Sequence, residues 1–524
     1  MTHRFLRSQS QHLCLLLALL ANGGQAMATP DTTPDINYQA ELSINAGSGD
    51  FAPYYIASGR GGTITQQGSA LLNASLWHPI DSTKQFSYGF GAEMWSGYAT
   101  STSYAQYSAE AQKWTSHSLH PARLWLQQLY GEVKYRCLTL TAGMKQAHSP
   151  LLNSNLSSGD LVMSGNARPM AGVTIGSINY QPIPFTRGWV NIDAQLGYYK
   201  PGDNNWMSDH YNYFSHSLTT GYTFNYKRLH FRTKPNQPWV FTIGAQAACQ
   251  FGGTRVLYND GKVEKTIKMK TNFKSLIHTI IPGGGSTDGD QQYVEGNHLG
   301  SWDMMLSHQL PHGNTIKAYY QSLWEDGSGI GKLNGFDGLW GIEYCANKPS
   351  IVSGALLEYL DFTNQSGPIH WAPGDHDNPQ ATGMNTPSTG ADNYYNNYAY
   401  NGYHHHGMAI GSPFVKSPIY NTDGYIGFTD NRMRGFHMAL MGYVTPTISY
   451  RTMLSYRKSW GTPFIPHITP TTSTSFMLEG NYAPEWMPQL KLKAQFALDH
   501  GTLLGNNCGA LLSISYHGNF TLKK

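Results

Sequence analysis

Charged residues are scarce in this sequence, and neither sign of charge prevails. Asp, Glu, Lys and Arg make up 13% of the 524 residues, against about 25% in an ordinary soluble domain. The 35 basic and 32 acidic residues leave a formal net charge of +3. A nearly neutral chain offers no basic surface for a phosphate backbone, so we expect no nucleic-acid partner.

Cysteine is rare, and long apolar runs are missing from most of the chain. Beyond the N-terminal segment, no uncharged apolar stretch approaches the roughly 20 residues of a transmembrane helix, which excludes a helical membrane protein. Cys137, Cys249, Cys345 and Cys508 are widely spaced and lack the C-x-x-C pairs of a zinc or redox site. They are compatible with disulfides and equally with single packing residues.

Motifs for catalysis are also missing. The sequence has no G-x-S-x-G elbow, no H-E-x-x-H and no glycine-rich phosphate loop. We therefore predict that the protein is not an enzyme and has no catalytic residue, metal site or cofactor. His404, His405 and His406 form the one tight histidine cluster; consecutive side chains point in different directions, so a polar loop tip is favoured over a metal site.

The first 28 residues have the three parts of a secretion signal. These are a basic start, a short apolar run at 13–21 and an A-x-A-type site at 26–28. The apolar run is too short to span a bilayer. We therefore expect the protein to be exported, with residues 29–524 forming a single domain.

What the sequence has in abundance is alternation of apolar and polar residues. In WVNIDAQLGY (189–198), apolar side chains occupy every second position, with Asn191, Asp193 and Gln195 between them. Such a period of two over about ten residues is typical of a transmembrane β-strand. The same pattern occurs in SYGFGAEMWSGY (87–98), LKLKAQFALD (490–499) and GALLSISYHGNF (509–520).

The length of these strands favours one closed barrel over several soluble sandwiches. Sandwich strands average about five or six residues, and nothing in the sequence marks linkers between domains. A closed antiparallel barrel leaves no unpaired edge in the bilayer. At roughly 25 to 30 residues for each strand and turn, the chain has room for about 16 to 20 strands, an even number in bacterial single-chain barrels. We therefore predict an all-β, outer-membrane β-barrel in contact with lipid.

Long stretches without alternation interrupt the strands and should form extracellular loops. They include 200–216, 281–298 and 361–434. The long loops of outer-membrane barrels face outward, and loops on a rigid scaffold often carry function.

The third of these loops contains a stretch rich in tyrosine and asparagine. Aromatic rings stack on the apolar faces of sugars, and amides both donate and accept hydrogen bonds. A well-packed loop needs the same mixture, so both interpretations stay open. The candidate glycan-binding residues are Tyr394, Tyr395, Tyr398, Tyr400, Tyr403, Asn396 and Asn397.

The stretch SGNARPMAGVTIG (164–176) places a proline and an arginine before an expected strand. Pro169 fixes φ and removes a donor, which suits the entry to a strand. Arg168 would be costly inside a barrel unless it is paired or hydrated. A lumenal acid such as Glu93 or Asp193 is one expected partner, and an acidic polysaccharide is the alternative.

Several stretches resemble the capsule assembly Wzi family of Gram-negative outer-membrane proteins. They occur in the order found in the family and cover nearly the whole exported chain. The stretches are SGNARPM (164–170), PIPFTRGWVNIDAQLGY (182–198), EGNHLGSWD (295–303), YYQSLWEDGSG (319–329), DGLWGIEY (337–344), LLEYLDFTNQSG (356–367) and YNNYAYNGYHHHGMAIGSPF (395–414).

The resemblance implies an 18-stranded barrel that acts as a lectin-like anchor for capsular polysaccharide or exopolysaccharide, without a cofactor. It also implies that Asn166, Arg168 and Pro169 form a structural motif of the family. The expected state is a monomer. A porin or substrate channel is the main alternative and needs an open lumen; a lipid- or peptide-cleaving barrel is the third hypothesis.

Overall fold

The structure is a computed structural model that describes residues 36–214, 216–283, 294–366 and 392–520, together with the backbone of two short strands at 370–371 and 387–389. The predicted secretion signal lies outside the described residues and stays a prediction. The chain divides into a small unit, Met1–Ile36 with Asn519–Lys524, and a large unit, Asn37–Gly518. The barrel belongs to the large unit.

Eighteen antiparallel strands pair in chain order and close into a barrel when β30 meets β1. A two-residue strand, β9 (Gln181–Pro182), adds a short pairing beside β10. The prediction of an antiparallel barrel of about 18 strands is confirmed. The strands are β1 (Ile36–Ser48), β2 (Ser69–His78), β3 (Phe86–Ala99), β6 (Leu124–Tyr135), β7 (Leu138–Met144), β8 (Ala171–Ser177), β10 (Val190–Lys200), β12 (Thr223–Thr233), β13 (Trp239–Phe251), β16 (Asn297–Gln309), β17 (Thr315–Trp324), β18 (Gly338–Cys345), β19 (Gly354–Asp361), β26 (Met433–Thr445), β27 (Ile448–Gly461), β28 (Pro466–Tyr482), β29 (Leu490–Gly501) and β30 (Asn507–Phe520).

The alternation in the sequence separates the two faces of the barrel wall. On β30, Leu512 is 60% exposed on the outer face, whereas its neighbour Ser513 is 5% exposed on the inner face. The hydroxyl oxygen of Ser513 lies 2.8 Å from that of Ser43 on β1. An apolar outer face and a polar inner face are the arrangement of a barrel in the outer membrane, where this protein is located.

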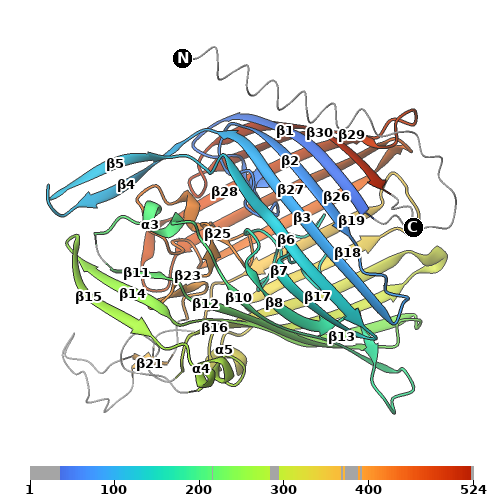
Figure 1. Ribbon diagram of the computed structural model, residues 1–524, viewed down its shortest axis with the longest axis horizontal. Coiled ribbons are helices and arrows are strands. Elements are labelled where there is room, and N and C mark those ends of the chain that lie inside the picture. Colours follow the sequence, from blue (N-terminus) through green and yellow to red (C-terminus); the bar gives the residue numbers. More distant parts are fainter. Residues whose placement is uncertain are drawn as a thin grey trace. The chain divides into compact units, whose positions relative to one another are not determined.

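The two ends of the barrel differ in the length of their connections. At one end the turns are short: residues 136–137 join β6 to β7, and 446–447 join β26 to β27. At the other end the connections include 145–170, 201–222 and 362–432. In Figure 1 the labelled elements of the 201–222 connection, α3 (Trp206–His210) and β11 (His216–Thr220), lie toward the left end of the barrel. Long loops face outward in barrels of this class, so the short turns face the periplasm.

The long loops carry most of the remaining secondary structure. Among the described residues no helix is long and apolar enough to cross a membrane. Cys137, Cys345 and Cys508 are free thiols. The smaller elements are α2 (Tyr54–Ala57), β4 (Thr102–Ser108), β5 (Lys113–Leu119), α3 (Trp206–His210), β11 (His216–Thr220), β14 (Gly253–Asn259), β15 (Lys262–Met269), α4 (Phe273–His278), η1 (Pro311–Gly313), α5 (Gly327–Ile330), β20 (His370–Trp371), β21 (Pro387–Thr389), β22 (Asn396–Asn397), β23 (Asn401–Gly402), β24 (His404–His405), β25 (Met408–Ala409) and η2 (Pro418–Tyr420).

Candidate functional site

Three loops from the outward end fold into the barrel and fill its interior. The first segment is 49–68, the second is 145–170, and the third is 392–432 within the β19–β26 connection. We call the three together the plug. Their apolar side chains belong to the main buried cluster of the protein. The hydrophobic plug residues with no exposed surface are Ile56, Ala57, Leu156, Leu161, Val162, Tyr394, Tyr395, Ala399, Ala409, Val415 and Phe428.

Asn166 joins the three plug segments through its side-chain amide. Its Oδ1 accepts a hydrogen bond of 2.9 Å from the backbone N–H of Gly59 in the first segment. Its Nδ2 donates over 3.1 Å to the carbonyl of Ala409 in the third segment. Asn166 is fully buried, so these bonds satisfy a side-chain amide that has no access to water. Pro169 is also buried, and β8 begins two residues later, as expected for strand entry.

The polar segment NSNLSSGD (153–160) attaches the plug to the barrel wall. Asn153 Nδ2 donates over 2.6 Å to Glu343 on β18. Glu358 on β19 accepts from the Ser157 hydroxyl and from the following backbone amide, each at 2.7 Å. Both glutamates are buried. The serines and asparagine of this segment therefore supply donors to buried lumenal acids.

Asp160 forms the deepest of these attachments. Its Oδ2 accepts from Gln246 on β13 at 3.1 Å and from Gln321 on β17 at 3.0 Å. The same two amides donate to Asp303 on β16, at 2.9 and 3.0 Å. Two buried carboxylates are thus bridged by two amide side chains. Such donors are required because a buried acid without partners is strongly destabilising.

The first segment has its own contacts with the wall. The backbone N–H of Tyr54 donates to Asp499 on β29 over 2.9 Å. The Tyr55 hydroxyl lies 2.8 Å from Nδ1 of His437 on β26, and the other ring nitrogen of His437 lies 2.6 Å from the carbonyl oxygen of Leu156. His437 therefore links the first and second segments to the same strand.

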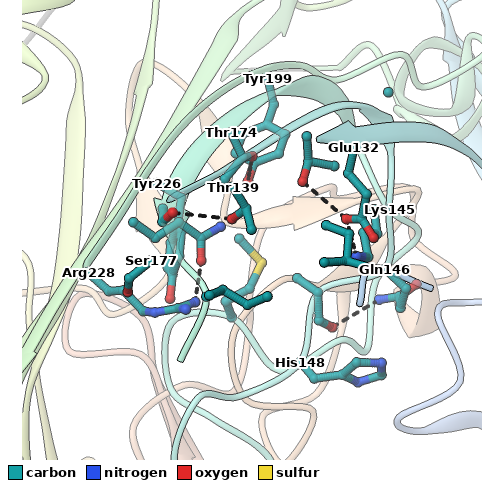
Figure 2. A pocket seen from close by; sticks show the side chains of 18 of the residues that line it. Glu132, Thr139, Lys145, Gln146, His148, Thr174, Ser177, Tyr199, Tyr226 and Arg228 are labelled. Carbon is teal, nitrogen blue, oxygen red and sulfur yellow. Dashed lines mark hydrogen bonds and ion pairs between the residues drawn. The ribbon is translucent and has the colours of Figure 1, made fainter. Parts of the chain in front are cut away.

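A polar cavity of about 420 Å³ lies between the second segment and the wall formed by β6 to β12. It includes Ile178 and Asn179, so it lies toward the short-turn end. Figure 2 shows Lys145 beside Glu132, and their ion pair measures 2.5 Å. Gln146 and His148 of the plug form its inner boundary, and burial lowers the pKa of His148. The cavity is a periplasmic recess that ends at the plug.

The sequence left a glycan surface and a packed loop both open for the tyrosine-rich stretch, and most of its tyrosines belong to a packed loop. Four of its five tyrosines are at most 1% exposed. The hydroxyl of Tyr395 donates to the Leu161 carbonyl over 2.7 Å, and that of Tyr403 to Val162 over 3.0 Å. These rings belong to the core of the plug, where they pack the third segment against the second. The buried tyrosines are Tyr394, Tyr395, Tyr400 and Tyr403.

Of the remaining candidates of that stretch, Asn396 is buried, and Asn397 and Tyr398 lie nearer the surface. Tyr398 is 55% exposed, and the Arg255 guanidinium lies 5.0 Å from its ring centroid. Asn396 Nδ2 donates to the Phe428 carbonyl over 2.8 Å. Asn397 Nδ2 donates over 3.2 Å to Asn297 Oδ1. Of the seven candidates, Tyr398 alone offers a largely exposed ring.

The histidine cluster is not the loop tip that the sequence suggested. His404 and His405 are 2% and 4% exposed. Burial lowers the pKa of His404 to about 3 and also lowers the pKa of His405 and of His406. Nδ1 of His405 lies 2.9 Å from the carbonyl oxygen of Arg168. Within the described residues no group of His, Cys, Asp and Glu is arranged to hold a metal ion.

The expected acidic partners of Arg168 are engaged elsewhere. Asp193 pairs with Arg228 at 2.9 Å, and Glu93 accepts from Trp95 at 2.7 Å. The Arg168 guanidinium instead lies over the ring of Trp125, 4.8 Å from its centroid. Its Nε is buried without a hydrogen-bond partner in the part of the chain that the structure describes. Burial lowers the pKa of Arg168 to about 10, so it stays protonated at neutral pH.

Comparison with known proteins gives similarity in structure alone. No family model and no curated protein matches this chain. OccAB2 of Acinetobacter baumannii is 8% identical, covers 93% of this chain and 98% of its own, and gives a TM-score of 0.45. OccK5 of Pseudomonas aeruginosa is 9% identical over 92% and 97% of the two chains, with a TM-score of 0.41.

Wzi of Escherichia coli, described as an outer-membrane protein involved in group 1 capsule assembly and as a carbohydrate-binding β-barrel, gives a TM-score of 0.53. The two sequences are 14% identical, and the match covers 93% of this chain and 85% of Wzi. At this identity the similarity concerns the fold. The chain is therefore a closed 18-stranded barrel of the outer membrane whose fold is similar to that of Wzi.

Proposed function

We propose that this protein is a non-enzymatic outer-membrane barrel that attaches or organises capsular or related polysaccharide at the cell surface. The observation that carries the proposal is the filled lumen. Three loops occupy the space that a channel would need, and they are tied to each other and to the wall by buried hydrogen bonds. What remains for function is the outward face formed by the long loops.

A surface made of long loops suits a polymer of repeating sugars. Each contact between a loop and a sugar unit can be weak, because neighbouring units of the same chain bind at high effective concentration. The similarity in fold to Wzi, a carbohydrate-binding barrel, agrees with this role. A substrate channel is disfavoured because its passage would require the plug to leave the lumen.

Retention of polysaccharide by cells tests the proposal. The gene is deleted, and cell-bound and shed polysaccharide are quantified in the deletion strain and in a strain complemented with the wild-type protein. We expect the deletion to move polysaccharide from the cell-bound to the shed fraction and complementation to reverse the change. Total polysaccharide serves as the control for synthesis. Unchanged retention in the deletion strain would contradict the proposal.

Conductance in planar bilayers tests the channel alternative with the same purified protein. We expect no large, stable conductance because the plug blocks the lumen. An 18-stranded barrel with an empty lumen would give a large, steady current. Such a current from the wild-type protein would favour the channel.

A further inference from the structure

A second cavity, of about 290 Å³, lies between the plug and the wall formed by β27, β28 and β29. His148 lines both this cavity and the first one. Arg451 and Lys493 of its wall lie three residues from Ile448 and Leu490, the periplasmic ends of β27 and β29. The cavity therefore lies on the periplasmic side of the plug.

Three basic side chains line this cavity: Arg60 from the first plug segment, and Arg451 and Lys493 from the wall. The Arg60 guanidinium donates over 2.5 Å to Oε1 of Gln495 on β29. Gln495 is the next lumenal residue after Lys493, and successive residues on one face of a strand are about 7 Å apart. Arg60 and Lys493 are therefore neighbours in the cavity.

Arg451 has an acidic partner. Its Nη2 lies 2.9 Å from Oε2 of Glu479 on β28, and its Nη1 donates over 2.9 Å to the backbone carbonyl of Asn155 in the plug. The other carboxylate oxygen of Glu479 accepts from Asn481 at 3.2 Å. Both oxygens of Glu479 are thus engaged, and the charge of Arg451 is balanced.

Arg60 and Lys493 lack such a partner. Neither forms an ion pair with any described residue, and the Lys493 ammonium donates no hydrogen bond to them. Glu41, another acid whose charge reaches Arg60, accepts from the Ser43 hydroxyl at 2.6 Å and from the Gln39 amide at 3.2 Å. Burial lowers the pKa of Arg60, because a cation is costly to remove from water.

The unpaired nitrogens of these two cations can be reached from the cavity. Arg60 and Lys493 are both partly exposed, and neither has an unpaired nitrogen that is fully enclosed. Beside them, Ser154 is exposed, and a Cβ on Gly59 would meet no atom within 4 Å. A solute in this space therefore has access to both positive charges.

The chemistry of the lining favours an oxyanion. Arginine and lysine bind carboxylate and phosphate through charge-assisted hydrogen bonds. The acid that lines the cavity, Asp160, is fully buried and already accepts from Ser149 at 2.6 Å and from Gln321 at 3.0 Å. The volume is close to the lower end of ligand pockets, roughly 300 Å³, which leaves room for a small organic molecule that carries the anionic group.

We propose that this cavity binds one oxyanion, a carboxylate or phosphate group of a small periplasmic solute, between Arg60 of the plug and Lys493 of the wall. The anion supplies the counter-charge that these two cations do not find among the described residues. Because Arg60 belongs to the plug and Lys493 to β29, the bound anion also adds a link between the plug and the barrel. The site lies on the periplasmic side and does not depend on the function proposed for the outward surface.

Calorimetry and thermal unfolding of the full-length protein in detergent test the proposal. The probes are inorganic phosphate, glucose 6-phosphate and glucuronate, with glucose as the neutral control, all at one ionic strength set with sodium chloride. We expect at least one oxyanion probe to bind the wild type and raise its melting temperature, and glucose to do neither. Binding of the phosphates alone indicates a phosphate-bearing solute, and binding of glucuronate alone indicates a carboxylate.

Lys493→Gln should weaken binding of the oxyanion about tenfold or more, because it removes one charge-assisted hydrogen bond. Lys493→Arg keeps the charge and should remain within about threefold of the wild type. Lys491→Gln is the matched control, because Lys491 is an exposed lysine of the same strand that does not line the cavity. Its affinity should equal that of the wild type. Arg60→Gln tests the plug side of the site and should weaken binding as Lys493→Gln does.

Two results would overturn the site. One is the absence of binding by every oxyanion probe. The other is equal affinity, or an equal rise in melting temperature with phosphate, in the wild type and Lys493→Gln, which would indicate a general effect of the salt. Retention of polysaccharide by cells is measured separately, so the failure of this site and the failure of the proposed function can be told apart.

Discussion

At the scale of single residues, a few buried polar side chains determine how the interior of this barrel is organised. Asn166 is the clearest case, since one amide satisfies a backbone donor in one plug segment and a backbone acceptor in another. Alternation in strands cannot reveal such a residue, because it lies in a loop and acts on loops.

Asn166→Leu should weaken the plug because it removes the acceptor of the Gly59 N–H and leaves the carbonyl of Ala409, a fully buried residue, without this donor. A buried group without its partner costs about 1–3 kcal/mol. Hydrogen exchange should therefore accelerate in 57–62 and 407–411, with a smaller effect on the strands. Asn155→Leu is the control, because its side chain is exposed in the same plug segment and should change stability by no more than about 0.5 kcal/mol. Equal exchange in both variants would contradict the role of Asn166.

Asp392 gives the third plug segment a dependence on pH. Burial, followed by the nearby Asp326 carboxylate, raises the pKa of Asp392 to about 7 from 3.8; the hydroxyl of Ser366 donates to it. An acid with a raised pKa in the folded state stabilises the fold fully below its unfolded pKa and loses that contribution as pH rises toward 7. Asp392 therefore favours the fold more at pH 5 than at pH 8, whereas the buried histidines with lowered pKa values, among them His148, His404 and His405, act in the opposite direction.

The change in melting temperature caused by Asp392→Asn should be more favourable at pH 8 than at pH 5, because asparagine does not titrate. Asp50→Asn is the control, since Asp50 is exposed in the first plug segment. Burial also raises the pKa of Asp337, to about 6, so part of the pH dependence should persist. An equal change in melting temperature at the two pH values would contradict this assignment.

At the scale of elements, segment 153–160 carries several of the hydrogen bonds between the plug and the barrel wall. It supplies the donors to Glu343 and Glu358 and the carboxylate that meets Gln246 and Gln321. Replacing it with glycine and serine residues of the same length removes these attachments and leaves the wall intact.

This replacement should convert a non-conducting barrel into one with a measurable, fluctuating conductance in planar bilayers. The control replaces residues 109–112, the tip of the β4–β5 hairpin, in the same way and should leave conductance at the wild-type level. If both variants remain closed, the first and third segments fill the lumen without the second.

Sequence alone predicted the wall of this protein far better than its filling. The period of two placed Asp193 and Gln195 on the lumenal face. In a strand with lipid on one side and water on the other, the polar side chains must face the water and the apolar ones the lipid. The loops had no such constraint. Tyrosine and asparagine in 394–403 suit a glycan surface and a packed interior equally, so the sequence could not separate the two.

The strands of the wall carry one sequence signal for the plug. Glu358 and His437 interrupt otherwise apolar stretches at lumenal positions of their strands. A buried acid or imidazole at such a position needs a partner inside the barrel. The partner of Arg168 could not be predicted, because its neighbour Trp125 lies on β6 and meets Arg168 only where the β7–β8 loop folds into the barrel.

At the scale of the whole molecule, an introduced positive charge should destabilise the protein more on the lipid-facing wall than on the extracellular loops. Leu512→Arg places a cation on the lipid-facing side of β30 and should destabilise folding into vesicles by about 2–4 kcal/mol. Val263→Arg, on an equally exposed side chain of β15, should cost about 0–1 kcal/mol because that hairpin lies in water. Denaturant titrations in phospholipid vesicles measure both. Equal penalties would contradict this placement of the membrane.

All three inward segments begin and end at the same outward rim. The plug is thus continuous with the loops that form the outward surface of the barrel. If a polymer bound at the rim were drawn along by flowing liquid, the force would act on the hydrogen bonds of Asn153, Ser157 and Asp160 together. The force would be shared among several hydrogen bonds between the plug and the rigid barrel wall. The attached polymer should therefore resist shear better than a polymer held by a single loop.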